Sequence, residues 1–530
     1  MFDVLIAGGE VYDGTGGEPL RVDVGVLGDR VAVVGPNLAP EAAAVIDATG
    51  KAVCPGFINI LSHSYFSILY DPRSLGELTQ GVTTEVFGEG TSMGPLTPRM
   101  KAELGRRDGL DYEVTWTRLS EYLRHVEQRG ASQNVASFIG SGTLRANAVG
   151  YSDRPATPAE LDRMRALAAE EMADGALGIA SALIYPPGSY AGTAELTALC
   201  RVAAEYDGCY ASHVRGEGEN LDEAIAEFLG IVRDAGLRGE VFHLKASGRP
   251  NWHRMDGAIE LIERSRAAGV PVTADVYPYT ASSTGLTSII PDQYHEGGAD
   301  ALYDRLGDPR IRAEIRTELS WSARWGEVTE AENVLILRAS REENRRWQGR
   351  TLAEVAATTG TDPIEAAMDL IASDRTRIQV AFFSMSEENL RAALARPWVA
   401  ISSDGMSMAP AGMFLRAPTH PRAYGSFARV LGHYARDEKV LPLGEAIRRM
   451  SALPAATLGL RDRGVLCPGS FADIVVFDPA TVGDRATFGN PHQLSAGVSE
   501  VLVNGKVTIS SGTFTGELAG RALTGPGARR

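Results

Sequence analysis

Three consecutive stretches in the middle of the chain decide its fold: GCYASHV (208–214), GEVFHLK (239–245) and VPVTADVYPY (270–279). Each is short and mostly apolar, as expected of a strand that is buried in a parallel sheet. The segment NLDEAIAEFLGIVRDAG (220–236) lies between the first two and repeats its apolar residues at helical spacing. One strand and one helix therefore alternate over about the length of a β-α unit.

The same alternation extends outward from this centre. Further strand candidates are VTTEVFG (82–88), NVASFIGS (134–141), GALGIASALI (175–184) and PWVAISSDG (397–405). Seven or eight such units favour an α/β fold of the closed (β/α)8 TIM-like barrel type over an open doubly wound sheet. The stretch IQVAFFSMSEE (378–388) gives one strand more than a barrel needs, and the sequence does not identify which candidate lies outside. A nucleotide-binding fold lacks its motifs, since no GxGxxG follows the first strand and no GxxxxGK[ST] occurs.

The two ends of the chain have a different pattern from its middle. Residues 1–55 and 464–520 contain β-branched runs punctuated by Gly and Asp, and the Asn-Gly pair of VLVNGKVTI (501–509) predicts a hairpin. We expect one small β-sandwich built from both ends, with the catalytic barrel at 56–463; independent flanking sheets are the alternative. The alternation also breaks over 286–347, which predicts an inserted, partly helical, lid-like subdomain.

Composition excludes several classes of protein. The 530 residues are 44% hydrophobic and 22% charged, as in an ordinary globular protein, and the net charge of -15 argues against a nucleic-acid partner. Four cysteines without CxxC pairing, no secretory signal and no apolar run long enough to span a bilayer predict a cytoplasmic protein without membrane attachment. A small molecule is the expected partner. A homo-oligomer is compatible with the sequence, which does not determine the oligomeric state.

Rare polar residues fall at the predicted strand ends. His213 ends GCYASHV and His243 lies near the end of GEVFHLK, on strands that look consecutive. A barrel gathers the carboxyl ends of its strands on one face, so two such imidazoles can converge on one divalent ion, for which zinc is the usual choice. Asp404, in AISSDGM, could ligate metal or act as a general base, although an Asp-Gly after a strand also serves as a turn or helix cap.

The combination of motifs resembles the amidohydrolase superfamily, and more narrowly its N-acyl-D-amino-acid deacylase (D-aminoacylase) branch. The resemblance spans nearly the whole chain in the right order. It rests on PGFIN (55–59), QGVTTEVFGEG (80–90), YASHVRGEG (210–218), FHLKASGR (242–249), ADVYPYTAS (274–282), SSDG (402–405), HPRAYGSFARVLG (420–432) and FADIVVFDP (471–479). It implies that His213 and His243 hold a tightly bound zinc and that Asp404 is the general base.

Two departures from the family pattern alter the expected metal site. The usual His-x-His after the first strand is altered, because Leu61 stands at its first position and only His63 remains. The cysteine that often ligates from the second strand is replaced by Gly90, and Glu89 is the nearest group able to take its place. We therefore expect one tightly bound zinc, with Glu89, His213 and His243 as ligands and His63 near the open position. A second metal should be weak or absent. The alternative for Glu89 is a place outside the ligand set.

The substrate residues come from the resemblance. It assigns Arg422 to a substrate carboxylate, assisted by Lys245 and by Tyr277 or Tyr279. Ser283 and Tyr185 are weaker candidates for lining the pocket, and for each aromatic residue packing within the barrel is an equal alternative. Lys245 also follows His243 by two residues, which places both on one strand face. His420 is expected to be solvated surface.

The predicted function is zinc-dependent hydrolysis of N-acyl-D-amino acids to a carboxylate and a D-amino acid. Zinc would activate water and polarise the amide carbonyl, and Asp404 would carry a proton from the water to the leaving amine. The preference for D-substrates comes from the resemblance alone. Two alternatives stay open: a cyclic-amide or D-peptide hydrolase of the same superfamily, and a metal-free, non-catalytic homologue. The acyl group, the side-chain preference and the pathway are not set by the sequence.

Overall fold

The barrel wall consists of two arcs of parallel strands. We analysed a computed structural model, which describes residues 1–38, 41–105, 112–321 and 331–528. One arc has the order β10-β9-β8 and the other the order β11-β12-β13-β14-β15-β19. The strands are β8 (Phe57–Asn59), β9 (Val82–Phe87), β10 (Asn134–Ser137), β11 (Ile139–Gly140), β12 (Gly178–Ala182), β13 (Cys209–His213), β14 (Arg238–Val241), β15 (Val272–Val276) and β19 (Val399–Ile401).

Short contacts join the two arcs into a closed barrel. Only Phe138 separates β10 from β11, so these two strands form one stave. On the other side, a parallel bridge pairs Ser62 with Gly405, and the N–H of His63 donates to the carbonyl of Gly405 at 2.8 Å. The (β/α)8 barrel predicted from the periodicity is confirmed.

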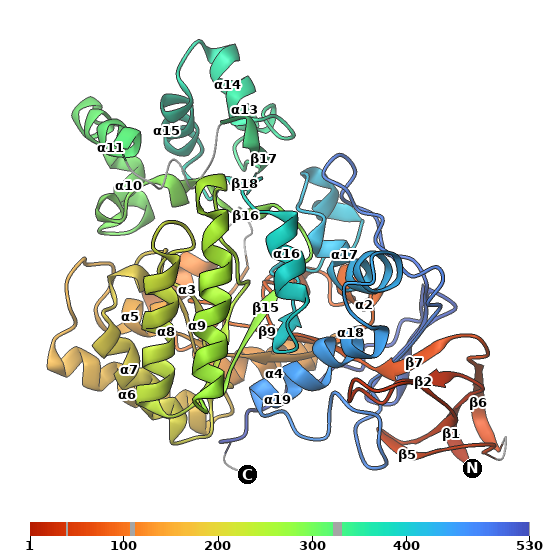
Figure 1. Cartoon of the computed structure of the whole chain (residues 1–530). Helices are drawn as coiled ribbons and strands as arrows, with labels where there is room; N and C mark the ends of the chain where they lie inside the picture. The colour runs from red at the N-terminus through yellow and green to blue at the C-terminus, as the bar shows by residue number, and fades with distance from the viewer. Residues whose placement is uncertain (39–40, 106–111, 322–330, 529–530) are drawn as a thin grey trace.

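Helices surround this barrel on the outside. Figure 1 shows α5 to α9 standing side by side around the wall. They are α5 (Ser141–Ala148), α6 (Pro158–Ala173), α7 (Thr193–Ala204), α8 (Leu221–Ala235) and α9 (Met255–Ala267); α4 (Leu119–Arg129), α16 (Glu387–Leu394), α17 (Arg422–Arg429) and α18 (Leu443–Met450) complete the layer. Apolar side chains fill the barrel interior, among them Ile58, Val86, Ala180, Ala211 and Phe242. This filling leaves the chemistry to the strand ends.

Two sheets pack together at the lower right of Figure 1, one built from the N-terminal strands and the other from strands of both chain ends. The first has the order β5-β4-β1-β6 and the second the order β23-β22-β21-β20-β7-β2-β3. Their strands are β1 (Phe2–Ala7), β2 (Glu10–Val11), β3 (Leu20–Arg21), β4 (Asp23–Leu27), β5 (Arg30–Gly35), β6 (Ala42–Asp47), β7 (Ala52–Pro55), β20 (Ile474–Phe477), β21 (Val498–Val503), β22 (Lys506–Ser510) and β23 (Thr513–Phe514). The predicted Asn504-Gly505 turn joins β21 to β22, with positive φ at both residues.

A separate unit interrupts the barrel between β15 and β19 and lies at the top of Figure 1. It contains an antiparallel sheet of order β16-β18-β17 and its own apolar core. Its elements are β16 (Ser282–Gly285), α10 (Ala299–Arg305), α11 (Pro309–Trp321), β17 (Val334–Arg338), α13 (Glu342–Arg345), α14 (Leu352–Thr359), α15 (Pro363–Asp374) and β18 (Gln379–Phe382).

The predicted C-terminal boundary of this inserted unit is wrong. It was expected at 286–347, but β18 pairs with both β16 and β17, so the unit extends to Phe382. β18 is also the surplus strand that the sequence could not assign. Most of the stretch WSARWGEV (321–328) lies outside the described residues. Among the helices that the structure describes, none combines the length and the apolar character needed to cross a bilayer.

Candidate metal centre and active site

Four strand ends bring polar side chains to the same face of the barrel. His213 is the last residue of β13, and His243 follows β14 by two residues. Glu89 lies two residues beyond β9, and Asp404 lies three residues beyond β19. His243 and Asp404 both have positive φ, at 38° and 44°, which turns the chain sharply after each strand. Such conformations are uncommon for residues other than glycine and often occur at functional sites.

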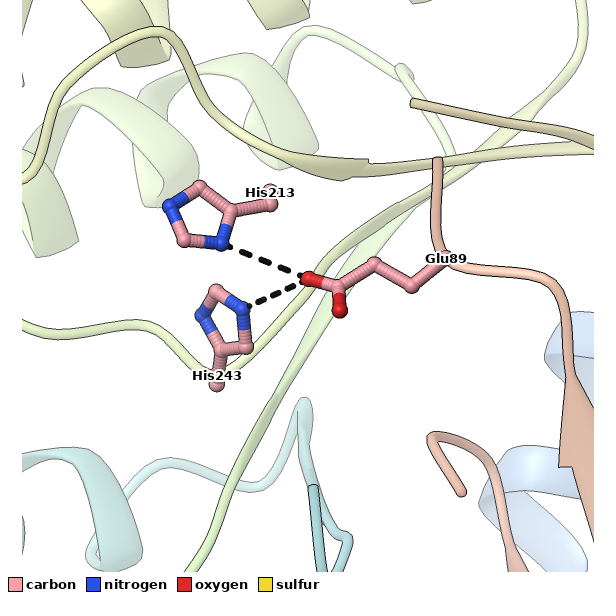
Figure 2. A group of neighbouring side chains, drawn as sticks. All are labelled: Glu89, His213 and His243. Carbon is pink, nitrogen blue, oxygen red and sulfur yellow. Dashed lines mark hydrogen bonds and ion pairs between the residues drawn. The ribbon is translucent and has the colours of Figure 1, made fainter. Parts of the chain in front are cut away.

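The Glu89 carboxylate lies at the centre of three histidines. Its Oε1 is 3.0 Å from Nε2 of His243 and 3.3 Å from Nδ1 of His213. Figure 2 draws both contacts as dashed lines. Its Oε2 is 3.2 Å from Nε2 of His63. Burial opposes ionisation of Glu89, but hydrogen bonds to the three imidazoles outweigh it and hold its pKa well below the usual range. Glu89 is therefore an anionic oxygen donor between three imidazoles.

Backbone geometry explains why Glu89, and not position 90, supplies this donor. Gly90 has φ +61°, and a Cβ at this residue would lie 2.5 Å from the Cβ of Ala182. A side chain at position 90 would therefore require the neighbouring strand end to move. The glutamate one residue earlier has a longer side chain and reaches the histidines without such a clash.

The two imidazoles and the carboxylate fit a divalent transition metal. The donor atoms of Glu89, His213 and His243 all lie within 4.8 Å of one another. Nitrogen and oxygen donors in a buried group of three are the ligand set of catalytic zinc sites, which keep further positions open for water and substrate. His63, Glu89 and Asp404 form a second group that meets the same distance limit.

Leu61 adds no ligand to that second group. Its side chain is buried among the apolar residues of the barrel interior, and its carbonyl accepts the N–H of Asp404 at 3.0 Å. His63 instead pairs with Asp404, with 3.0 Å between Nε2 and Oδ1. Burial lowers the tendency of His63 to take a proton, but hydrogen bonds to Asp404 and Glu89 raise its pKa to about 10.

Glu217 is a part of the site that the sequence interpretation missed. Its Oε1 is 3.1 Å from Nδ1 of His243, and its Oε2 is 3.7 Å from Nε2 of His213. Both are the ring nitrogens that face away from Glu89. A carboxylate behind a metal-binding histidine fixes the ring orientation and raises the basicity of the ligand. The only signal for Glu217 in the sequence is its position, four residues after the strand-end His213. It lies in a loop without periodicity, so its direction could not be predicted.

Lys245 lies against Glu217 and His243. Its ammonium nitrogen lies 2.5 Å from Oε1 of Glu217, 2.7 Å from Nδ1 of His243 and 2.9 Å from the carbonyl of His243. With Nε2 of His243 turned to Glu89, its Nδ1 carries a hydrogen that faces Glu217 and cannot also accept from Lys245. Two of the three ammonium N–H donors therefore have acceptors, which are Glu217 and the His243 carbonyl. The third donor is left for the expected contact with a substrate carboxylate, which stays a prediction.

Arg422 lies beside the general-base candidate. Its Nη1 donates to Oδ2 of Asp404 at 2.7 Å, and its Nη2 donates to the carbonyl of Ser283 at 3.2 Å. Its guanidinium carbon is 4.7 Å from the centre of the Tyr277 ring. Burial raises the pKa of Asp404, but Arg422, His243 and His63 outweigh this and lower it below its ordinary value. Asp404 is thus held in its anionic form, which can accept a proton.

Tyr277 and Tyr279, the two alternatives for a substrate contact, have different surroundings in the structure. Tyr277 lies in the site, with its ring 6.5 Å from the His243 ring, whereas the Tyr279 hydroxyl points to Asp484 at 3.3 Å. Tyr185 also borders the site, since its ring is 5.6 Å from that of His213. Ser283 contacts the site through its backbone carbonyl, which accepts from Arg422. Its hydroxyl oxygen lies 3.4 Å from the amide nitrogen of Gln379.

His420 corrects a further expectation. The residue was expected on the solvated surface but is only 3% exposed. Its Nδ1 accepts the N–H of Arg422 at 3.0 Å and its Nε2 donates to the carbonyl of Ala281 at 2.9 Å. Burial and the adjacent Arg422 charge hold its pKa well below the ordinary value, so it is neutral. His420 therefore fixes the start of the helix that carries Arg422.

Comparisons with known proteins agree with this geometry. A model of the amidohydrolase family matches residues 44–509. The D-aminoacylase of Alcaligenes xylosoxydans xylosoxydans is 35% identical over 98% of this chain and 97% of its own length. The N-acyl-D-glutamate deacylase of the same organism is 34% identical over 95% of this chain and 93% of its own.

A solved structure extends the likeness to three dimensions. The N-acyl-D-glutamate deacylase of Bordetella bronchiseptica, complexed with zinc and a phosphonate inhibitor, superposes with a TM-score of 0.82. It is 31% identical, and the match covers 99% of both chains. With its buried group of histidines and carboxylates, the chain belongs to the amidohydrolase family and is a metal-dependent amidohydrolase of the D-aminoacylase branch.

Proposed function

We propose that this enzyme hydrolyses the amide bond of N-acyl-D-amino acids and uses one tightly bound zinc ion. The observation that carries the proposal is Arg422, a buried guanidinium that lies directly beside Asp404 and the metal group. An amide hydrolase needs the metal and the base, and a fixed arginine that keeps unused donors beside them also suits a substrate with an anion close to its scissile bond. The α-carboxylate of an N-acyl-amino acid is such an anion.

The metal group of the proposal consists of Glu89, His213 and His243. A zinc ion held there would polarise the amide carbonyl and make water more acidic. The D-configuration and the zinc are supported by the names of the relatives, one of which was crystallised with zinc. The geometry of the described residues supports a transition metal of this class without distinguishing the hand of the substrate.

The protein residues then have separate tasks. Asp404 accepts the proton of the attacking water and returns it to the leaving amine. His63 holds one oxygen of Asp404 and Arg422 holds the other, so the carboxylate keeps one orientation. Arg422 uses two of its N–H groups for Asp404 and Ser283, and its remaining donors are available for the α-carboxylate of the substrate. Tyr277 covers the guanidinium face.

A substrate panel tests the proposal. Purified enzyme supplemented with zinc is incubated with N-acetyl-D- and N-acetyl-L-amino acids, and the released amine is measured by chiral chromatography. We expect release from D-substrates only, together with close to one zinc per chain by elemental analysis. Amine release from L-substrates would refute the proposed preference for D-substrates. If no substrate of the panel releases an amine, the deacylase assignment is refuted in favour of cyclic amides or D-peptides.

A further inference from the structure

The edge strand β16 connects the inserted unit to the active site. One of its edges pairs with β18. The residues around it contact the site: the Tyr185 hydroxyl lies 2.7 Å from Oγ1 of Thr284, and Arg422 donates to the carbonyl of Ser283. Side chains that reach β16 from the inserted unit are therefore close to the place where a substrate must lie.

Arg377 is such a side chain. It lies in the chain just before β18, and its Nη2 donates to Oγ1 of Thr284 at 3.0 Å. The absence of a side chain at Gly285 makes room for it, because a Cβ there would lie 2.7 Å from Cγ and 2.9 Å from Nε of Arg377. Arg377 thus lies across β16 and carries its guanidinium toward Tyr185, whose ring contacts that of His213.

The charge of Arg377 has no acidic partner in the part of the chain that the structure describes. No described carboxylate lies within ion-pair distance, 4.0 Å, and the contact with Thr284 uses one of five N–H donors. The nearby Arg375 shows the ordinary surface arrangement, since its Nη1 pairs with Asp304 at 2.9 Å. A half-buried guanidinium beside an active site with most of its donors unused is suited to bind an anion.

We propose that Arg377 forms a second anion-binding subsite, which selects N-acyl-D-amino acids with an acidic side chain. This inference rests on the proposed function. Arg422 and Arg377 hydrogen-bond to consecutive residues of β16, Ser283 and Thr284. A substrate whose α-carboxylate is held by Arg422 can therefore present a second carboxylate, one side chain away, to Arg377. Guanidinium groups bind carboxylates through paired, charge-assisted hydrogen bonds.

The test compares two substrates of equal shape. The ratio of kcat/KM for N-acetyl-D-glutamate to that for N-acetyl-D-glutamine isolates the side-chain charge. We expect a ratio of about 10 to 100 in the wild-type enzyme, the range for one hydrogen bond to a charged group. Arg377→Gln should lower this ratio toward 1. Arg375→Gln is the matched control, because it removes the same charge two residues away and should leave the ratio unchanged.

A binding measurement keeps the inference separate from the deacylase assignment. Stabilisation against thermal unfolding by D-glutamate and by D-glutamine needs no turnover, and we expect the larger shift with D-glutamate to disappear in Arg377→Gln. A wild-type ratio near 1, or a preference for glutamate that survives in Arg377→Gln, would overturn the subsite. If no N-acyl-D-amino acid is hydrolysed, the proposed function fails, and the thermal shifts alone then decide for or against Arg377. Thermal unfolding of each variant without ligand reports whether it is folded.

Discussion

Glu217 offers the sharpest test of how the metal group is held, through the substitution Glu217→Gln. The change keeps the shape of the side chain and removes its charge. In the wild-type protein the two oxygens lie 3.1 Å from His243 and 3.7 Å from His213, behind the nitrogens that face Glu89. The amide has no charge and can accept only through its oxygen, so the attraction to both rings is lost and the 3.1 Å contact with His243 persists only if that oxygen faces the ring.

The expected magnitude follows from two effects with the same sign. Loss of a carboxylate behind a metal-binding histidine typically weakens metal affinity by about 10- to 100-fold, or about 1.4 to 2.7 kcal/mol. The substitution also leaves the Lys245 ammonium, 5% exposed, without its carboxylate partner, which places an unneutralised positive charge beside a bound cation. We therefore expect the affinity loss to fall toward the upper end of that range.

The assay is a competition between the protein and a chromophoric chelator for zinc at pH 7.5. Glu219→Gln is the matched control, because Glu219 lies two residues further along the same loop and is exposed. It should bind zinc as tightly as the wild-type protein. Unchanged zinc affinity in Glu217→Gln, or an equal loss in both variants, would show that Glu217 does not support the metal-binding histidines.

Four other predictions concern the base, the ligand, the arginine and a buried acid. Asp404→Asn should lower kcat by about 10²- to 10⁴-fold while elemental analysis still finds zinc, because it removes the proton acceptor and not the Glu89 group. Glu89→Gln should lower the zinc content itself, measured after gel filtration, because it removes the anionic ligand. Arg422→Ala should lower kcat/KM for N-acyl-D-amino acids by about 10- to 100-fold, whereas equal turnover would favour cyclic amides that carry no carboxylate. Burial raises the pKa of Glu171 to about 7. Since the folded state then binds this proton more tightly than the unfolded state, stability should fall as the pH rises from about 4.5 to 7, and Glu171→Gln should reduce that slope in thermal unfolding curves.

The sequence predicted those parts of the site that depend on regular spacing. His213, His243 and Asp404 follow strands with clear apolar runs, and a barrel brings all such strand ends to one face. Their convergence therefore follows from the fold without further information. Glu89 required a comparison with the family motif, and the structure supplies its reason in the close approach of Gly90 to Ala182.

The features that the sequence did not predict depend on loops and on antiparallel strand pairing. Glu217 and His420 lie in segments without periodicity, so their neighbours are set by tertiary contacts alone. The surplus strand β18 has the same apolar character as a barrel strand, and only its antiparallel partners reveal its place. Tyr277 and Tyr279 would share a face in a regular strand, but β15 ends at Val276, and the two hydroxyls consequently point to different partners.

The surroundings of Asp404 give a physical reason to expect one tightly bound ion and not two. A second ion would use His63, Glu89 and Asp404, the group in which Leu61 contributes no donor. One oxygen of Asp404 is already paired with the Arg422 guanidinium at 2.7 Å, and a cation that competes for this carboxylate must lie close to that fixed positive charge. Repulsion between the two cations is strong in a buried site, where little solvent screens it. Under the proposed function, Arg422 therefore has two roles: it offers donors to the substrate carboxylate, and it disfavours a second metal, which leaves Asp404 free to act as the base.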